Sequence, residues 1–366
     1  MSRVLSMSVL RGAALIMFAV IAAAAATSAQ LDPAAQRVED GYAQLETVAM
    51  RVSAIEARRD MLEDLETEVS STEQFNAWRA ALRARDDVEY AALVERSRLP
   101  ARLEEYPGAG GVAAAILDAT GDPDLKVILL TGLERLAERG RFPRPYYESL
   151  ARRHVASESD LDRETREIAE SEELEVPGEI ADIYLVYAPI AQEMGARRGQ
   201  DQLIRWLLVD TMANEVDDES RARFLEGVNP IVGRIDDANT RYVIEVFEEL
   251  GFDQIFEHVP SIAELGIAII HHGNNLPARR SFLTIIEPLA LRGEFDQQRY
   301  AVFYDRLAET EGRPQRYGTQ DMCVDGERVP YTLEEPAGEV DIRRSEVGLG
   351  SIDDYFELIR GQYGGC

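Results

Sequence analysis

The feature that most constrains the fold of this 366-residue chain is a long stretch of helix-forming sequence over residues 32–100. Ala, Leu, Arg and Glu dominate this stretch, and Gly and Pro are almost absent. Its apolar residues recur at the spacing of one helix face. Ser71 and Thr72 precede the apolar residues Phe75 and Trp78, which predicts that a new helix starts there. The sequence therefore predicts a mainly α protein.

The helical pattern continues to about Glu311, interrupted by segments rich in Gly and Pro. Pro107 to Gly111 predicts a turn or loop within the first half. Residues 178–193 and 201–214 predict two helices, separated by a turn at Gly195 to Gly199.

The pattern changes near the C-terminus. Residues 313–340 carry Gly, Pro, Thr, Val and Tyr, and they predict short strands and loops. Two short helices are expected to follow, near residues 341–347 and 351–360. We therefore expect a helical N-terminal region at 30–176 and an α-rich C-terminal domain at 177–366, which contains the strand and loop segment.

Residues 1–29 have the three parts of a secretory signal peptide. Arg3 and Arg11 supply positive charge, Ala13 to Ala26 form an apolar run, and Thr27 to Ala29 provide a small-residue cleavage site. The apolar run is shorter than the roughly 20 residues that a membrane span requires. The sequence therefore predicts a protein that is periplasmic or secreted, without stable membrane insertion. An uncleaved N-terminal anchor is the alternative.

Net charge and cysteine content narrow the classes of function. The formal net charge is -28, and such a surface repels phosphate backbones, so we expect no nucleic-acid partner. Cys323 and Cys366 are the only cysteines. An even cysteine count in an exported protein predicts a disulfide between them rather than a thiol nucleophile.

The second half carries a series of polar motifs in a fixed order. They are Asp201-Gln202-Leu203-Ile204-Arg205, Asp237-Ala238-Asn239-Thr240, Glu249-Leu250-Gly251-Phe252, His271-His272, Asp305-Arg306, Gln315-Arg316-Tyr317-Gly318-Thr319-Gln320, Arg343-Arg344, Gly348-Leu349 and Tyr355. In this order and spacing, residues 185–362 resemble a family of uncharacterised bacterial domains, domain of unknown function 6624. The resemblance implies a domain and a set of candidate residues, but no activity. Where the family usually has Gln-His, this chain has His271-His272, so His271 is the substitution.

Several candidates allow both a structural and a functional interpretation. Arg205 could bind a carboxylate or phosphate while Asp201 orients it, or the two could form a surface salt bridge. Asn239 could face a ligand or, with Asp237, cap the helix that follows. Asp305 has apolar neighbours at helical spacing, so it needs a partner, and Arg306, Arg343 or Arg344 could supply one.

The histidine pair and the segment after Pro314 are the other candidates. Adjacent helical residues diverge by about 100°, so one of His271 and His272 should line a cleft or the core and the other should face solvent. If the segment is a strand, Gln315, Tyr317 and Thr319 share one face and Gln320 points the other way. That face could bind a polar ligand or tie the segment to the helices.

Two hypotheses of function remain open. In the first, His272 and Asp305 are catalytic and act on a small polar or anionic ligand, for instance in hydrolysis. The residues expected to bind this ligand are Arg205, Asn239, Arg306, Gln315, Tyr317, Thr319, Gln320, Arg343 and Arg344. The second hypothesis is a non-catalytic helical interaction or scaffold protein. No metal motif, phosphate-binding loop or dinucleotide fingerprint is present in the sequence, so we expect neither a metal nor a cofactor.

Overall fold

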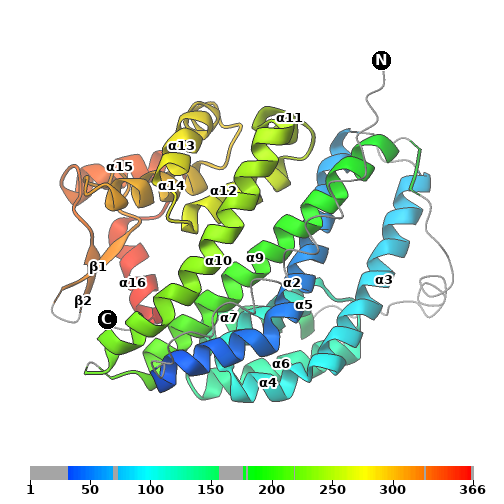
Figure 1. Cartoon of the computed structure of the whole chain (residues 1–366), viewed down its shortest axis with the longest axis horizontal. Coiled ribbons are helices and arrows are strands. Elements are labelled where there is room, and N and C mark those ends of the chain that lie inside the picture. Colours follow the sequence, from blue (N-terminus) through cyan, green and yellow to red (C-terminus); the bar gives the residue numbers. More distant parts are fainter. Residues whose placement is uncertain are drawn as a thin grey trace, which may run out of the picture.

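The structure is a computed structural model, and the signal peptide predicted at 1–29 lies outside the residues that it describes. The described residues are 32–68, 73–155, 176–178, 180–217, 219–324 and 327–363. Nearly all elements in these ranges are helices, and the sheet in them has two strands. The prediction of a mainly α protein is confirmed (Figure 1).

The first half contains six α-helices and one 3-10 turn within its described residues. Their bounds are α2 Pro33–Glu68, α3 Glu73–Ser97, α4 Leu99–Glu105, η1 Pro107–Ala109, α5 Gly110–Ala119, α6 Pro123–Glu138 and α7 Arg144–Val155. The predicted helix start after Thr72 is confirmed by α3. Asp122 caps α6, because its carboxylate accepts hydrogen bonds from the backbone N–H groups of Asp124 and Leu125.

The turn or loop predicted at Pro107 to Gly111 is a 3-10 turn over Pro107–Ala109, and α5 follows it directly from Gly110. The glycines there serve close packing. A Cβ atom on Gly108 would lie 2.6 Å from the backbone oxygen of Trp206 in the second half of the chain. The glycines that predicted a turn or loop therefore also allow two segments of backbone to approach each other closely.

The second half contains eight more helices and the two strands. Their bounds are α9 Ala181–Glu215, α10 Arg221–Leu250, α11 Phe252–His258, α12 Pro260–His272, α13 Leu276–Leu291, α14 Gln297–Thr310, β1 Asp321–Val324, β2 Glu327–Pro330, α15 Ala337–Glu346 and α16 Ile352–Tyr363. The strands pair antiparallel, with Asp321 opposite Pro330 and Val324 opposite Glu327. The predicted strand and loop segment and both closing helices are confirmed.

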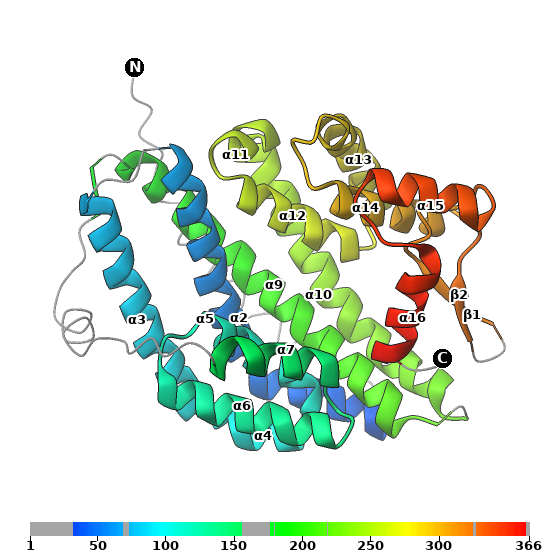
Figure 2. The same cartoon turned by 180° about the vertical axis from the view of Figure 1, so that it is seen from behind.

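The predicted turn at Gly195 to Gly199 is wrong, because α9 runs through these residues without a break. The two glycines face α2, which lies alongside α9 (Figures 1 and 2). A Cβ atom on Gly195 would lie 2.2 Å from the backbone oxygen of Ser53, and one on Gly199 would lie 2.2 Å from that of Ala49. Glycine is therefore required at these positions so that the two helix backbones can touch.

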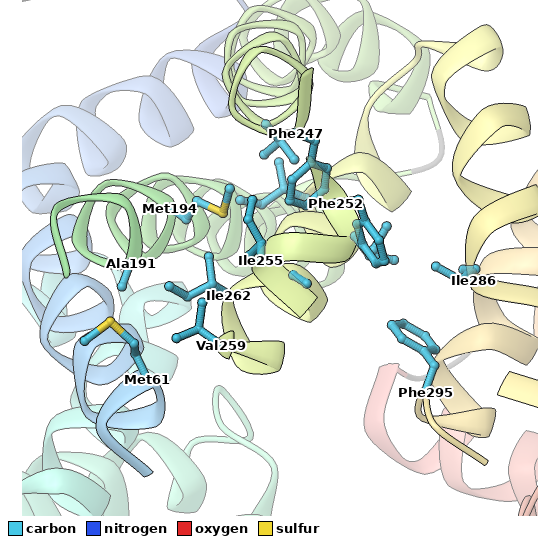
Figure 3. Packing of buried hydrophobic residues seen from close by; sticks show 14 of the residues in the cluster. Met61, Ala191, Met194, Phe247, Phe252, Ile255, Val259, Ile262, Ile286 and Phe295 are labelled. Carbon is cyan, nitrogen blue, oxygen red and sulfur yellow. The ribbon is translucent and has the colours of Figure 1, made fainter. Parts of the chain in front are cut away.

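Two large hydrophobic cores hold most of the described helices together, and each draws on both halves of the chain. A small third core of Val340, Ile352 and Phe356 joins α15 to α16. In the first core, Met61 of α2 packs with Ala191 and Met194 of α9 (Figure 3). The second core joins Leu45 and neighbouring residues to Leu203 of α9. The buried residues thus do not separate at residue 176. None of the described helices is both long and apolar enough to cross a membrane.

Candidate functional site

His272 is held by a buried carboxylate on another helix. It is the last residue of α12, and its Nδ1 atom lies 2.9 Å from both Oδ1 and Oδ2 of Asp201 on α9. The Asp201 side chain is only 2 % exposed. We had expected Asp305 to work with His272, but the carboxylate that contacts His272 is Asp201.

Cations and an amide saturate the remaining hydrogen-bonding capacity of Asp201. Its Oδ2 atom accepts from Arg198 Nη1 at 2.6 Å and from Gln202 Nε2 at 2.8 Å. Its Oδ1 atom lies 2.7 Å from Arg205 Nη1. The Asp201–Arg205 contact foreseen from the helical spacing is thus present, but its carboxylate is buried. The set of donors fixes the carboxylate in one orientation.

These surroundings determine the protonation states of His272 and Asp201. Burial lowers the pKa of His272 below its ordinary value. The positive charges of Arg205 and Arg198 lower it further, whereas the hydrogen bond to Asp201 and its negative charge oppose the change. Burial alone would raise the pKa of Asp201, but the hydrogen bond from His272 and the neighbouring charges outweigh it and hold the pKa well below its usual range. A neutral imidazole beside a carboxylate donates Nδ1–H to it, which leaves a lone pair on Nε2.

His272 lines a cleft of about 780 Å³ between α2, α12 and α14, which we call the histidine cleft. Figure 2 shows α12 between α9 and α14. The lining residues are Asp60, Glu63, Asp64, Arg198, Ser261, Glu264, Leu265, Ile267, Ala268, His271, His272, Gln298, Arg299, Val302, Phe303 and Leu349.

His271 lines the same cleft, so the expectation that only one of the two histidines could do so is wrong. The ring centroids of His271 and His272 are 5.1 Å apart, and the His271 ring centroid is 6.0 Å from that of Phe303 on α14. The cleft covers the last turn of α12 from the α9 side to the α14 side, so side chains 100° apart both reach it. Burial and nearby positive charges, of which Arg306 is one, lower the pKa of His271 well below its ordinary value.

Carboxylates line the other part of the cleft. Asp60, Glu63 and Asp64 of α2 lie opposite Glu264 of α12. Asp64 accepts hydrogen bonds from the backbone N–H of Ser261 at 3.0 Å and from its hydroxyl at 2.5 Å. Burial, together with neighbouring carboxylates, raises the pKa values of Asp60, Asp64 and Glu264. Our sequence reasoning missed these residues, although like charges at i and i+4, as in Asp60 and Asp64, were an available signal.

The cleft is elongated along α12. Ser261 and His272 are 11 residues apart on this helix, which corresponds to about 16 Å at 1.5 Å per residue. The Ser261 hydroxyl therefore serves Asp64 and cannot act as a nucleophile activated by His272. Among the described residues, no group of three or more His, Cys, Asp or Glu side chains is placed to hold a metal ion.

Asp305 has a different environment and does not line the histidine cleft. It is fully buried in α14 and accepts hydrogen bonds from the backbone N–H groups of Arg316, Tyr317 and Thr319 and from the Thr319 hydroxyl. Burial raises its pKa, and these hydrogen bonds oppose the change. All of these donors come from the single segment that follows α14, so Asp305 shapes that segment.

The remaining motif residues of this region complete a buried hydrogen-bond network. The Gln315 amide pairs with the backbone N–H and C=O of Gln320 at 2.7 and 2.9 Å. Arg344 donates to the backbone oxygens of Tyr317 and Gly350, and the Tyr355 hydroxyl donates to that of Thr319. These residues lie close to one another but do not line the cleft of His272, and their polar groups satisfy one another within the fold.

The other predicted ligand-binding residues are also in ion pairs or hydrogen bonds outside the cleft lining. Arg306 pairs with Glu309, and Arg343 pairs with Glu334. Asn239 lies inside α10 instead of capping a helix, and its side chain joins α10 to Arg197 of α9. The arginines that line the histidine cleft are Arg198 and Arg299, which the sequence did not single out.

Two further features bear on the choice of site. A second cavity, of about 750 Å³, lies between α10, α11 and α13, and neither histidine nor arginine lines it. The histidine cleft is therefore the better candidate for chemistry. Cys366 lies outside the described residues, so the disulfide with Cys323 stays a prediction.

The molecule is thus a mainly helical protein with an aspartate–histidine pair at the wall of an acidic cleft. Residues 232–365 match the model of a family of unknown function, DUF6624, and this part of the chain is a domain of that family. The match begins within α10, so His272 and the Asp305 network belong to the domain, whereas Asp201 precedes it. We expected the family-like region to start at residue 185, which is earlier than the start of this match at residue 232. No curated protein sequence and no solved structure matches the chain.

Proposed function

We propose that the protein binds a small polar ligand in the histidine cleft and that Asp201 and His272 hydrolyse it by general acid–base catalysis. The observation that carries this proposal is the contact of His272 Nδ1, at 2.9 Å, with both oxygens of the buried Asp201 carboxylate. This contact orients the imidazole at the cleft wall. A histidine with one nitrogen held in this way presents the other to substrate or water.

In the proposed reaction, His272 Nε2 takes a proton from a water molecule that attacks the ligand, and Asp201 stabilises the imidazolium that forms. The same imidazolium then returns the proton to the leaving group. Among the described residues, Ser261 is the serine that lines the histidine cleft, and it lies about 16 Å along α12 from His272, which favours water as the nucleophile. A positioned acid–base group of this kind contributes about 10²- to 10⁴-fold to a rate.

The charges of the cleft also suggest which ligands it accepts. Arg198 is paired with Asp201, and Arg299 is paired with Glu264. Four carboxylate side chains line the cleft, those of Asp60, Glu63, Asp64 and Glu264, against the two arginines. We therefore propose a neutral polar or positively charged ligand group here, rather than an anionic one.

The non-catalytic interaction protein is kept as a second candidate function. It is favoured by the network around Asp305, because residues shared with the family-like motifs are buried and satisfied by one another. In that case the contact between Asp201 and His272 is a structural link between α9 and α12.

His272→Gln tests the proposal against this alternative. The full chain is screened with nitrophenyl esters, phosphates and glycosides and with small amines and amides, using hydrolysis and thermal shift. We expect His272→Gln to lose at least about 100-fold in hydrolysis, with a change of only a few degrees in Tm.

His154→Gln is the matched control, since His154 also contacts an aspartate, with its Nε2 atom 2.8 Å from Asp118, but does not line the cleft. It should leave hydrolysis unchanged. Equal hydrolysis by the wild-type chain and by His272→Gln would reject the catalytic proposal and favour the interaction protein.

A further inference from the structure

We propose that Arg205 and Asp236 extend the Asp201–His272 pair into a chain of four interacting side chains, in which the charge of Asp236 regulates His272 as a base. This inference rests on the proposed function and adds its regulation. Arg205 and Asp236 are positioning residues here, because neither lines the histidine cleft.

The geometry joins the four side chains without a gap. Arg205 Nη1 lies 2.7 Å from Asp201 Oδ1, and Arg205 Nη2 lies 3.0 Å from both Oδ1 and Oδ2 of Asp236. One guanidinium thus links the carboxylates of α9 and α10. Asp236 is 5 % exposed, so water screens its charge poorly.

The charges in this cluster balance when His272 is neutral. Arg198 and Arg205 are positive, and Asp201 and Asp236 are negative. Loss of the Asp236 charge leaves a net positive charge beside His272. Arg205 is then no longer shared with Asp236 and interacts with Asp201 alone. It therefore competes more strongly with His272 for the carboxylate oxygens of Asp201. Both effects disfavour the imidazolium and make His272 a weaker base.

The charge of Asp236 can change near neutral pH. It faces Arg205 and Asp201 from α9, lies beside Asp237 on α10, and interacts electrostatically with Arg279 of α13. Burial raises the pKa of Asp236 to about 6, with Asp201 and Asp237 adding to the rise and Arg205 opposing it. As pH falls through about 6, Asp236 is neutralised and His272 loses basicity, so the site is favoured above this pH.

Asp236→Asn tests the inference in the full chain, with Asp237→Asn as the matched control because Asp237 is the exposed neighbour on the same helix. The His272 imidazole is titrated by NMR, and its signals are assigned by their absence in His272→Gln. We expect Asp236→Asn to lower the His272 pKa by about half to one unit, which is roughly a three- to tenfold loss of proton affinity. Asp237→Asn should leave it unchanged.

An equal His272 pKa in the two variants would overturn the inference. If Asp236→Asn fails to fold, Arg205→Gln removes the link instead, and an unchanged His272 pKa in that variant has the same meaning. The titration needs no substrate, so it separates the two proposals. A shift without hydrolysis by any variant rejects catalysis alone, whereas hydrolysis that needs His272 but ignores Asp236 rejects only the regulation.

Discussion

Two buried aspartates show how surroundings decide the role of a residue. Asp201 is surrounded by Arg198, Arg205 and His272, and two of these groups, Arg198 and His272, line the cleft. Asp305 is surrounded by uncharged donors of one chain segment. The first arrangement couples charged groups on different elements electrostatically, and the second stabilises the conformation of one chain segment.

Glu56 provides a prediction of pH-dependent stability. It lies on α2 one turn before Asp60, and burial raises its pKa to about 7, with Asp60 adding to the rise and Arg59 opposing it. Between about pH 4.5 and 7 the folded state holds a proton that the unfolded state releases, so the stability contributed by this group falls as pH rises through that window. Glu56→Gln, which stays neutral, should raise the free energy of unfolding at pH 8 by about 1–3 kcal/mol and leave it unchanged at pH 4.5.

Urea unfolding at the two pH values measures this effect. Glu63→Gln is the control, because Glu63 lies on the same helix with its side chain 65 % exposed. A Glu56→Gln variant no more stable than wild type at pH 8 would show that the folded state does not penalise the Glu56 charge.

At the scale of elements, the contact between α2 and α9 depends on glycine. Alanine normally favours a helix over glycine by about 1 kcal/mol. Gly195→Ala should nevertheless destabilise the protein by about 2–4 kcal/mol, because its Cβ atom would meet the Ser53 backbone oxygen, which cannot move without shifting α2. Thermal and urea unfolding measure the loss.

Gly233→Ala is the matched control. Gly233 lies inside α10, and a Cβ atom there would meet nothing within 4 Å. This substitution should therefore be neutral or raise stability by up to about 1 kcal/mol. If both variants gain stability, the close approach of α2 and α9 is not a constraint on the fold.

At the scale of the whole molecule, the two halves share their cores. Met61, Phe75 and Trp78 of the first half belong to the same core as the helices α9 to α14. The fragment 177–366 would expose that surface and would also lack the cleft carboxylates of α2. We expect this fragment to lack a cooperative thermal transition, whereas residues 30–366 should show one by circular dichroism. A fragment that melts cooperatively near the Tm of the longer chain would show instead that the C-terminal part folds alone.

The sequence by itself determined the mainly helical fold, the strand and loop segment at 313–340 and the two closing helices. These follow from propensity and apolar spacing, which act over a few neighbouring residues. It also identified His272 and Asp201 as notable polar residues, and it indicated the DUF6624 domain, although with a start at residue 185 rather than 232.

Only the tertiary structure decided which residues work together. His272 and Asp201 are 71 residues apart in sequence, and no local pattern pairs them rather than His272 with Asp305. In the sequence, Gly195 and Gly199 are compatible both with a turn and with a close helix contact. Only the position of α2 in space distinguishes the two. The same holds for the cleft, whose wall joins Asp60 of α2 to Glu264 of α12. Packing of distant elements sets these contacts, because burial and charge pairing depend on the positions of side chains in space and not along the chain.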